Sequence, residues 1–194
     1  MKELDQIYKP DEDSFLLLKY VERLVAGSVL DMGTGSGIQA IAAARKREVH
    51  EVTAVDINPN AIEEAFKRSK LEGVSGKIEF KVSNLFDGLG CRKFDWIVFN
   101  PPYLPSEGTV DETSWVGGEY GCELLLRFLD EASKYLNPDG RILLVYSSLS
   151  GMDLAKIRKR YTVTLLEEKP LFFESLYCIM LTPINPSSDL TKIL

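Results

Sequence analysis

The alternation of short apolar strands with helical segments constrains the fold of this chain more than any other feature. Runs typical of buried strands lie at residues 29–32, 52–55, 78–82, 94–99 and 142–146. Helical patterns lie at residues 11–26, 37–47, 58–73, 122–136 and 152–161. Strands that alternate with helices pair in parallel, and right-handed crossovers place the helices on both faces of the sheet. The sequence therefore predicts an α/β protein with a Rossmann-like, doubly wound and mostly parallel sheet.

The C-terminal part of the chain predicts an antiparallel edge to this sheet. Two alternating runs lie at residues 161–167 and 176–181, and no helix fits between them. They are therefore predicted to pair as an antiparallel hairpin, which brings the expected number of strands to seven. The run Asn137-Pro138-Asp139-Gly140 predicts a turn before the strand that precedes this hairpin.

The length of the chain predicts one domain over residues 1–194, with an N-terminal helix at 11–26 and a loose tail at 183–194. The start of the chain lacks the apolar core of a signal peptide, and no apolar run is long enough to span a membrane. Three widely spaced cysteines argue against a disulfide framework and fit a reducing compartment. We therefore expect a cytoplasmic protein.

Net charge and the scarcity of histidine exclude several functions. The chain has 23 basic and 29 acidic residues, a net charge of −6, whereas a general nucleic-acid binder needs a basic face. The basic runs at 45–47 and 158–160 are interpreted as the solvated ends of helices. His50 is the single histidine. His50 lies next to charged residues ahead of a strand, which disfavours a Ser-His-Asp triad, and a single histidine with this cysteine spacing argues against a metal site.

The segment Asn100-Pro101-Pro102-Tyr103 is the strongest indication of chemistry. It follows the apolar strand at 94–99, which the two prolines end because neither can donate to the ladder. Ligands of open α/β sheets bind at such strand ends. The Asn100 side-chain oxygen and a nearby backbone carbonyl can each accept one N–H of a planar –NH2 group, and Tyr103 can lie flat against it. The segment predicts a site that turns an amide or ring amine toward an electrophile; a plain strand-ending turn is the alternative.

A glycine-rich turn after the first strand predicts a cofactor site. It reads Asp31-Met32-Gly33-Thr34-Gly35-Ser36-Gly37. Gly33, Gly35 and Gly37 allow the backbone to turn tightly and to approach a ligand at the start of the next helix. This G-x-G-x-G spacing differs from the G-x-G-x-x-G of nicotinamide enzymes. Asp31 favours a cationic group over a pyrophosphate.

The ends of the next two strands carry further polar groups. Asp56 ends the second strand, where a carboxylate can bind both hydroxyls of a ribose. Asn84 and Leu85 follow the third strand, where they can contact the edge and the face of an adenine. Each alone could be a helix cap or a turn former. In series, they predict a site for an adenosine that carries a cation, which describes S-adenosylmethionine better than NAD.

With these motifs the chain resembles the class I S-adenosylmethionine-dependent methyltransferases over about residues 8–182. Asn-Pro-Pro-Tyr is similar to the motif of the HemK/PrmC group, which methylates the glutamine of the Gly-Gly-Gln motif in class-1 release factors. Two segments resemble the eukaryotic and archaeal branch of that group. They are Tyr-Lys-Pro-Asp-Glu-Asp-Ser at 8–14 and Trp-Val-Gly-Gly-Glu-Tyr-Gly at 115–121.

The resemblance implies the class I methyltransferase fold and direct transfer of a methyl group to an amide nitrogen. It implies that one set of residues contacts the cofactor: Ser14, Asp31, Gly33, Gly35, Gly37, Asp56, Asn84, Leu85 and Asn100. It also implies that Asn100 and the segment Pro101, Pro102 and Tyr103 hold the accepting nitrogen. No metal ligand is implied in this chain.

The chain departs from the family pattern in two places. Asn84 stands where the family usually has Asp, so its hydrogen bonding to adenine differs. Bacterial members carry an N-terminal helical domain that grips the release factor, and only 28 residues precede residue 29 here. We therefore expect loops, the tail or a partner to grip the substrate, and the resemblance implies a small zinc-binding activator subunit. The loop at 104–121 is the expected substrate lid.

The sequence leaves four other functions open. The same tetrapeptide serves nucleic-acid adenine or cytosine methyltransferases, which flip a base out of the helix. The net charge of −6 argues against this class of enzyme. A protein lysine methyltransferase is disfavoured because the tetrapeptide suits a planar nitrogen. The intact tetrapeptide also disfavours a non-catalytic cofactor-binding scaffold, and the glycine spacing disfavours a nicotinamide dehydrogenase.

Overall fold

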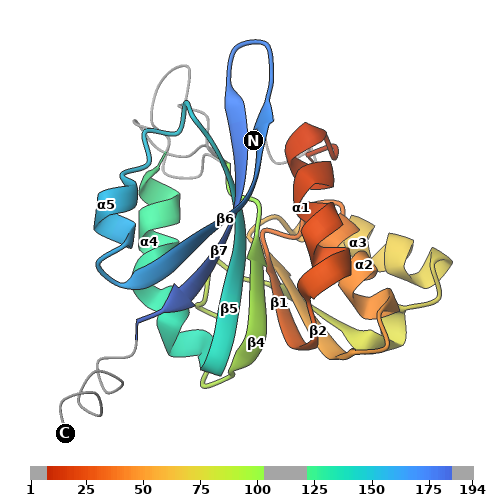
Figure 1. The fold of residues 1–194 in the computed structure, drawn as a ribbon. Coiled ribbons are helices and arrows are strands. Elements are labelled where there is room, and N and C mark those ends of the chain that lie inside the picture. The colour runs from red at the N-terminus through yellow and green to blue at the C-terminus, as the bar shows by residue number, and fades with distance from the viewer. Residues whose placement is uncertain (1–7, 103–121, 185–194) are drawn as a thin grey trace, which may run out of the picture.

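The computed structural model describes residues 8–102 and 122–184 (Figure 1). The strands are β1 (Gly27–Met32), β2 (Val49–Asp56), β3 (Ile78–Val82), β4 (Phe94–Phe99), β5 (Leu136–Ser147), β6 (Tyr161–Pro170) and β7 (Ser175–Pro183). The helices are α1 (Glu12–Leu24), α2 (Ile38–Arg45), α3 (Pro59–Leu71), α4 (Glu123–Ala132) and α5 (Leu154–Ile157). Short 3-10 turns lie at Ser75–Lys77 and Ser133–Tyr135.

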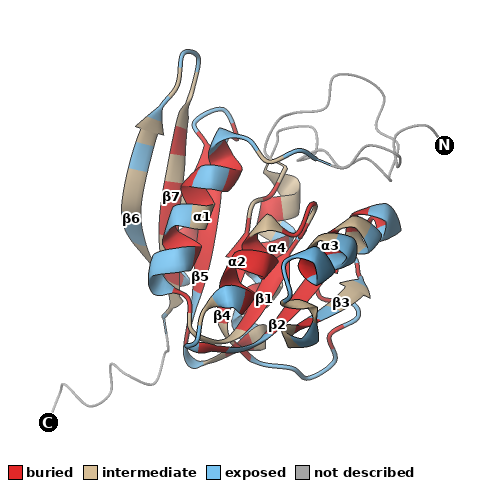
Figure 2. Ribbon diagram, turned by 90° about the vertical axis from the view of Figure 1, so that its right-hand side faces the viewer, coloured by how far each residue is buried: buried red, intermediate tan, exposed pale blue. Residues whose placement is uncertain are grey.

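The strands form one 7-stranded sheet in the order β3-β2-β1-β4-β5-β7-β6. Strands β1 to β5 pair in parallel, whereas β7 pairs antiparallel with both β5 and β6. Helices α1, α2 and α3 cover one face, onto which Figure 2 looks, and α4 and α5 cover the other (Figure 1). The predicted α/β class, the mostly parallel sheet and the C-terminal hairpin are confirmed. None of the helices in the described ranges is long and apolar enough to cross a membrane.

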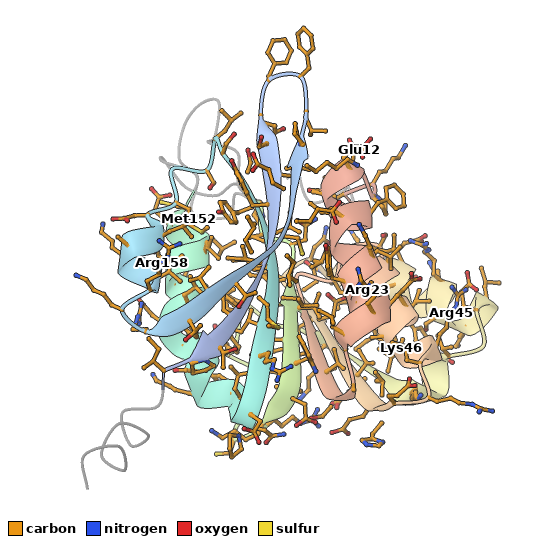
Figure 3. The ribbon with its side chains drawn as sticks, in the orientation of Figure 1. Glu12, Arg23, Arg45, Lys46, Met152 and Arg158 are labelled. Carbon is orange, nitrogen blue, oxygen red and sulfur yellow. The ribbon has the colours of Figure 1, made fainter. Side chains whose placement is uncertain are left out.

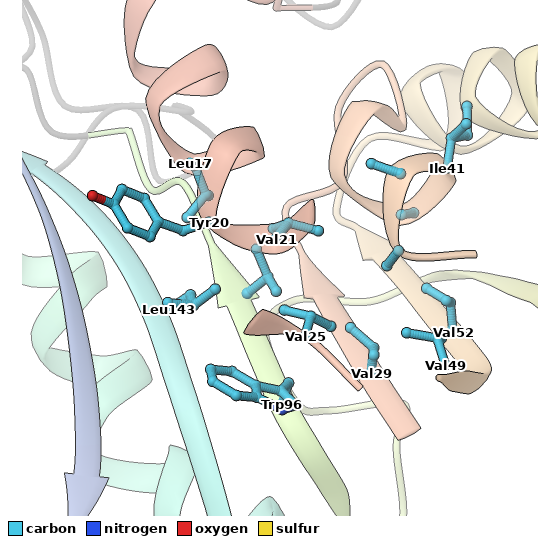
Figure 4. Close-up of a cluster of buried hydrophobic side chains, with 14 of the residues drawn as sticks. Leu17, Tyr20, Val21, Val25, Val29, Ile41, Val49, Val52, Trp96 and Leu143 are labelled. Carbon is cyan, nitrogen blue, oxygen red and sulfur yellow. The ribbon is translucent and has the colours of Figure 1, made fainter. Parts of the chain in front are cut away.

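The central strands are apolar on both faces because they supply two separate hydrophobic cores. On β4, Trp96 and Val98 belong to the core beneath α1 and α2, whereas Ile97 and Phe99 belong to the core beneath α4. Figure 4 shows part of the first core around Trp96. Burial on both sides explains why these strands read as continuous apolar runs and not as an alternation of apolar and polar residues.

Capping residues fix the starts of two helices. Helix α1 begins after Asp11, whose side chain accepts the backbone N–H of Glu12 at 2.8 Å, and it ends at Leu24, short of the predicted end. Helix α3 begins after Asn58, whose side chain accepts the backbone N–H of Asn60 at 2.9 Å. Both caps satisfy N–H groups that have no partner within the helix.

The predicted turn at residues 137–140 is wrong, because these residues belong to β5. Phe94 of β4 pairs with Leu136, but Trp96 pairs with Arg141, so the intervening residues of β5 bulge out of the ladder. A bulge accommodates extra residues without ending a strand. Turn-forming residues therefore mark a local irregularity here, not the boundary between two elements.

The helix predicted at 152–161 is also largely wrong. Asp153 caps a single turn, α5, through the backbone N–H of Ala155. The chain then enters β6 at Tyr161, whose hydroxyl is buried and donates to the carbonyl of Leu129 at 2.8 Å. This tertiary contact ends the helical pattern early. The tail expected from residue 183 also begins later, since β7 includes Pro183.

The two basic runs lie at helix ends, as predicted, and on different sides of the molecule. Figure 3 shows Arg45 and Lys46 at the end of α2 and Arg158 near α5. Arg45 forms an ion pair with Glu72, and Lys46 Nζ donates to the carbonyl of Glu22 at 2.6 Å. These residues therefore do not form a single basic face.

The β6–β7 hairpin extends past the sheet at the edge where the parallel strands end (Figure 1). Ser147, the last residue of β5, pairs with Leu176 near the start of β7, which puts the hairpin turn at that edge. Tyr20 of α1 donates its hydroxyl to Glu167 of β6 at 2.8 Å. Helix α1 is thus fixed relative to the edge of the sheet that carries the predicted site.

Candidate active site

The carboxyl ends of β3, β2, β1 and β4 lie side by side at one edge of the sheet, because these strands are parallel neighbours. The chain passes from β3 across to β4 on the other side of β1, so the strand order reverses beside β1. Ligands of open α/β sheets bind at such a switch point. Asp31, Asp56, Asn84 and Asn100 end or follow these four strands, so the fold brings the predicted residues to one edge.

Asp31, at the end of β1, is a buried carboxyl. Its Oδ2 accepts hydrogen bonds from Thr34 Oγ1 at 2.6 Å and from the backbone N–H of Ala40 at 3.0 Å. Burial raises the pKa of Asp31 to about 7, against the lowering effect of these two bonds. The carboxyl therefore links the glycine turn to α2 through hydrogen bonds. A nearby cation would favour its ionised form. Sequence reasoning had not assigned a role to Thr34.

The three glycines of the turn have different surroundings. Gly33, Gly35 and Gly37 have φ values of +63°, +52° and +80°, a region that favours glycine. A Cβ on Gly35 would have no neighbour closer than 4.0 Å, so the turn leaves open space there. A Cβ on Gly37 would lie 2.8 Å from the Cβ of Ala65 in α3. Gly37 therefore has a packing role between the turn and α3.

Asp56, at the end of β2, is buried and connects two backbone segments. Its Oδ2 accepts the N–H of Gly35 at 2.8 Å, and its Oδ1 accepts the N–H of Asn58 at 2.9 Å. Burial raises its pKa. Each carboxylate oxygen can accept a second bond, so both bonds leave capacity for the hydroxyls of a ligand.

Leu85, after β3, is the one non-glycine residue in the described ranges with a positive φ, +49°. Ser83 holds it in place, since Ser83 Oγ donates to the Leu85 carbonyl at 2.9 Å and accepts the N–H of Gly88 at 3.0 Å. Asn84 beside it is exposed, whereas Leu85 is buried. Strained backbone of this kind is concentrated at functional sites.

Asn100, after β4, presents a buried hydrogen-bond acceptor. Its Nδ2 donates to Ser14 Oγ at 3.3 Å, whereas its Oδ1 is buried and has no hydrogen-bond partner among the described residues. Pro101 is buried and Pro102 is half-buried. Tyr103 and the predicted lid at 104–121 lie outside the described residues. A buried unpaired acceptor is costly, so this oxygen has the capacity to accept a donor from a ligand.

Ser14 joins α1 to this part of the site, although it is 86 residues away from Asn100 in sequence. Its hydroxyl donates to Asp13 Oδ1 at 3.2 Å, and its carbonyl accepts Gln39 Nε2 at 2.8 Å. Tyr8 donates its hydroxyl to the same Asp13 oxygen at 2.7 Å. Sequence reasoning named Ser14 but missed the roles of Asp13 and Gln39. The 8–14 motif contained the signal for Asp13, whereas nothing in the sequence marked Gln39.

Residues 7–169 match the protein family described as Methyltransferase small domain. The chain belongs to this family. The matched range runs from α1 through β6, so it includes every strand end that contributes to the candidate site. The site residues in this methyltransferase domain are therefore part of the segment that defines the family.

Curated relatives of this methyltransferase domain are named for glutamine methylation. A Methanocaldococcus jannaschii protein named for protein N5-glutamine methyltransferase activity is 40% identical over 151 residues, 75% of each chain. A Bordetella pertussis ribosomal protein uL3 glutamine methyltransferase is 37% identical over 124 residues, 59% of this chain and 42% of that protein. A Koribacter versatilis release factor glutamine methyltransferase is 32% identical over 152 residues, 71% of this chain and 53% of that protein. The chain thus spans about half or less of these two bacterial relatives.

Solved structures with the same fold include two further methyltransferases. The Encephalitozoon cuniculi Mtq2-Trm112 complex, described as responsible for methylation of the eRF1 termination factor, gives a TM-score of 0.67 at 25% identity, over 92% of this chain and 99% of that one. The Thermus thermophilus 16S rRNA N2 G1207 methyltransferase RsmC, solved with AdoMet and guanosine, gives a TM-score of 0.70 at 24% identity. The match covers 91% of this chain and 44% of that one. The second likeness shows the fold alone.

Proposed function

We propose that this protein is an S-adenosylmethionine-dependent N-methyltransferase that acts on a side-chain amide, the glutamine of the Gly-Gly-Gln motif of a class-1 translation release factor. The observation that carries the proposal is the buried Oδ1 of Asn100 after β4, which has no hydrogen-bond partner among the residues that the structure describes. Such an oxygen accepts an N–H of a planar –NH2 group, and the following prolines end the strand so that the substrate can approach.

The residues at the strand ends fit S-adenosylmethionine. The open space at Gly35 allows a ligand to approach the backbone, and the buried carboxyl of Asp31, with its pKa of about 7, gains a partner from a cationic group. Asp56 has acceptor capacity for ribose hydroxyls, and Leu85 offers apolar cover for adenine. When bound, S-adenosylmethionine supplies the methyl group. Gly33, Gly37, Ser14 and Asn84 complete the proposed set of cofactor-binding residues.

The chain itself contributes positioning and fixed acceptors. An amide nitrogen is a weak nucleophile because its lone pair is delocalised. Asn100 Oδ1 and the Pro101 carbonyl accept the two N–H groups, which polarises the amide and holds its nitrogen in one direction. We also assign Pro102 and Tyr103, the rest of the predicted motif, to contact with the substrate amide. Acceptors fixed in advance lower the barrier without a strong base, since the product can lose its proton afterwards.

The choice of a release factor rests on the relatives. The Koribacter relative is named a release factor glutamine methyltransferase, and the Mtq2-Trm112 complex is described as responsible for the methylation of eRF1. By likeness to that complex, we propose that a small zinc-binding activator subunit is a partner of this chain. We place both in the cytoplasm, where translation takes place; Cys91, Cys122 and Cys178 are free thiols, as a reducing compartment requires.

Transfer of radiolabelled methyl groups tests the proposal. The substrates are a release factor, the same factor with its Gly-Gly-Gln glutamine changed to alanine, ribosomal protein uL3 and bulk RNA, each with and without the activator. Label on the intact release factor alone is the expected result. Label on RNA would instead assign the chain to base methylation, which the separation of the two basic runs disfavours. Label on uL3 would keep the amide chemistry and change the substrate.

A further inference from the structure

The Asn100 amide must present its oxygen, not its nitrogen, if it is to accept an N–H from a substrate. The two ends of an asparagine amide have nearly the same shape but opposite hydrogen-bonding character. Pro101 and Pro102 have no backbone N–H, so neither can select the orientation by donating to the amide oxygen. The selection must therefore come from whichever group binds the other end of the amide.

That group is the hydroxyl of Ser14, and Asp13 determines its polarity. An ionised carboxylate can only accept hydrogen bonds. Ser14 Oγ lies 3.2 Å from Asp13 Oδ1, so the hydroxyl proton of Ser14 points to Asp13. The lone pairs of Ser14 Oγ are then left to accept the Nδ2 of Asn100 at 3.3 Å. This order of donors and acceptors leaves Asn100 Oδ1 as the end of the amide that has no partner within residues 8–102 and 122–184.

The surroundings hold this chain of hydrogen bonds in place. Asp13 and Ser14 are 5% and 3% exposed, so water does not compete for them. Tyr8 donates its hydroxyl to the same Asp13 oxygen at 2.7 Å, and the backbone N–H of Ser14 also donates to it. Gln39 Nε2 donates to the Ser14 carbonyl at 2.8 Å, which ties this turn of α1 to α2.

We infer that Asp13 is a positioning residue that acts through Ser14 to orient the Asn100 amide with its oxygen toward the substrate. The inference rests on the proposed function for its consequence in turnover. It gives the first turn of α1 a role in aligning the accepting nitrogen, in addition to any contact with the cofactor. In this inference Asp13 acts on the amide through Ser14 and is not assigned a contact with the substrate.

Four variants separate orientation from folding. Asp13→Ala removes the acceptor, Ser14→Ala removes the hydroxyl, and Ser14→Thr keeps the hydroxyl. Glu12→Ala is the matched control, because Glu12 is an exposed carboxylate in the same first turn of α1. We expect kcat to fall at least tenfold in Asp13→Ala and Ser14→Ala, with the KM for the release factor changed less than threefold. Glu12→Ala should stay within threefold of the wild type, and Ser14→Thr should have a higher kcat than Ser14→Ala. Equal kcat in Ser14→Ala and the wild type, or a Ser14→Thr variant no better than Ser14→Ala, would overturn the inference.

A second readout does not depend on the substrate. The side-chain NH2 signals of Asn100 can be assigned in an NMR spectrum by their loss in Asn100→Ala. Their exchange with water should be at least tenfold faster in Asp13→Ala and Ser14→Ala than in the wild type and Glu12→Ala, at equal melting temperature. If the exchange rate of the Asn100 NH2 protons were the same in these variants as in the wild type, the inferred orientation of the amide would be refuted, even in an active enzyme. A wild-type protein that methylates no glutamine but shows the expected exchange would refute the proposed function alone.

Discussion

Asp56 Oδ2 accepts the backbone N–H of Gly35 at 2.8 Å, so the end of β2 holds the glycine turn that follows β1. The two residues are 21 positions apart and meet because β1 and β2 are parallel neighbours. One carboxylate therefore has two functions in the proposed site: it fixes the turn, and it keeps acceptor capacity for a ribose.

Replacing Asp56 by alanine should weaken cofactor binding by at least tenfold, because it removes the ribose acceptor and releases the turn at Gly35. The loss of a charge-assisted hydrogen bond is worth about 1.5–3 kcal/mol. Calorimetric titration with S-adenosylhomocysteine measures the effect. Affinity within twofold of the wild type would show that Asp56 does not contact the ligand.

Asn100→Ala should retain cofactor binding and lose turnover. By analogy with the removal of one oxyanion-hole donor, the barrier should rise by about 3 kcal/mol, roughly a hundredfold in kcat. The measurement is kcat with the release factor, beside the dissociation constant of S-adenosylhomocysteine as the control. A variant that methylates at nearly the wild-type rate would contradict the role assigned to the Asn100 oxygen.

Cofactor affinity should increase as the pH rises from 6 to 8. The pKa of Asp31 in the ligand-free folded protein is about 7, above the ordinary 3.8, because burial favours the protonated form. A cationic ligand favours the ionised form, so below about pH 7 binding must also release a proton. Titrations with S-adenosylmethionine at several pH values test this, and Asp31→Asn should flatten the profile. A profile equally steep in that variant would assign the pH dependence to another group.

The same shift predicts the effect of pH on stability without ligand. Since the folded pKa of Asp31 is raised, its contribution to the free energy of unfolding is most favourable below 3.8 and declines as the pH rises to about 7. Above that pH, ionisation of Asp31 no longer changes the free energy of unfolding. Comparing the denaturant midpoints of the wild type and Asp31→Asn across this interval isolates the contribution.

Gly37→Ala should destabilise the fold more than Gly73→Ala. Both glycines have positive φ values, +80° and +71°, so both variants incur backbone strain of about 1 kcal/mol. A Cβ at Gly37 would also lie 2.8 Å from the Cβ of Ala65, whereas a Cβ at Gly73 meets nothing within 4 Å. Overpacking should add about 1–3 kcal/mol at Gly37 alone. Equal shifts of the urea midpoint in the two variants would contradict the packing role.

The sequence by itself determined the features that depend on near neighbours. Apolar runs located β3 and β4 at their observed bounds, and Asn58 fixed the start of α3 through its own side chain. The positions of Asp31, Asp56 and Asn100 at strand ends followed from the same runs. The resemblance to known methyltransferases then indicated what these strand ends bind.

Only the tertiary structure decided the contacts between distant segments. The bulge at 137–140 depends on pairing with β4, and the early end of α5 depends on burial of Tyr161. The bond between Ser14 and Asn100 exists because α1 lies over the edge of the sheet where β4 ends, and it leaves the Asn100 oxygen with no partner in the described part of the chain. Periodicity and capping are local and carry no information on such distances, since which segments meet is set by strand order and by packing on the two faces of the sheet.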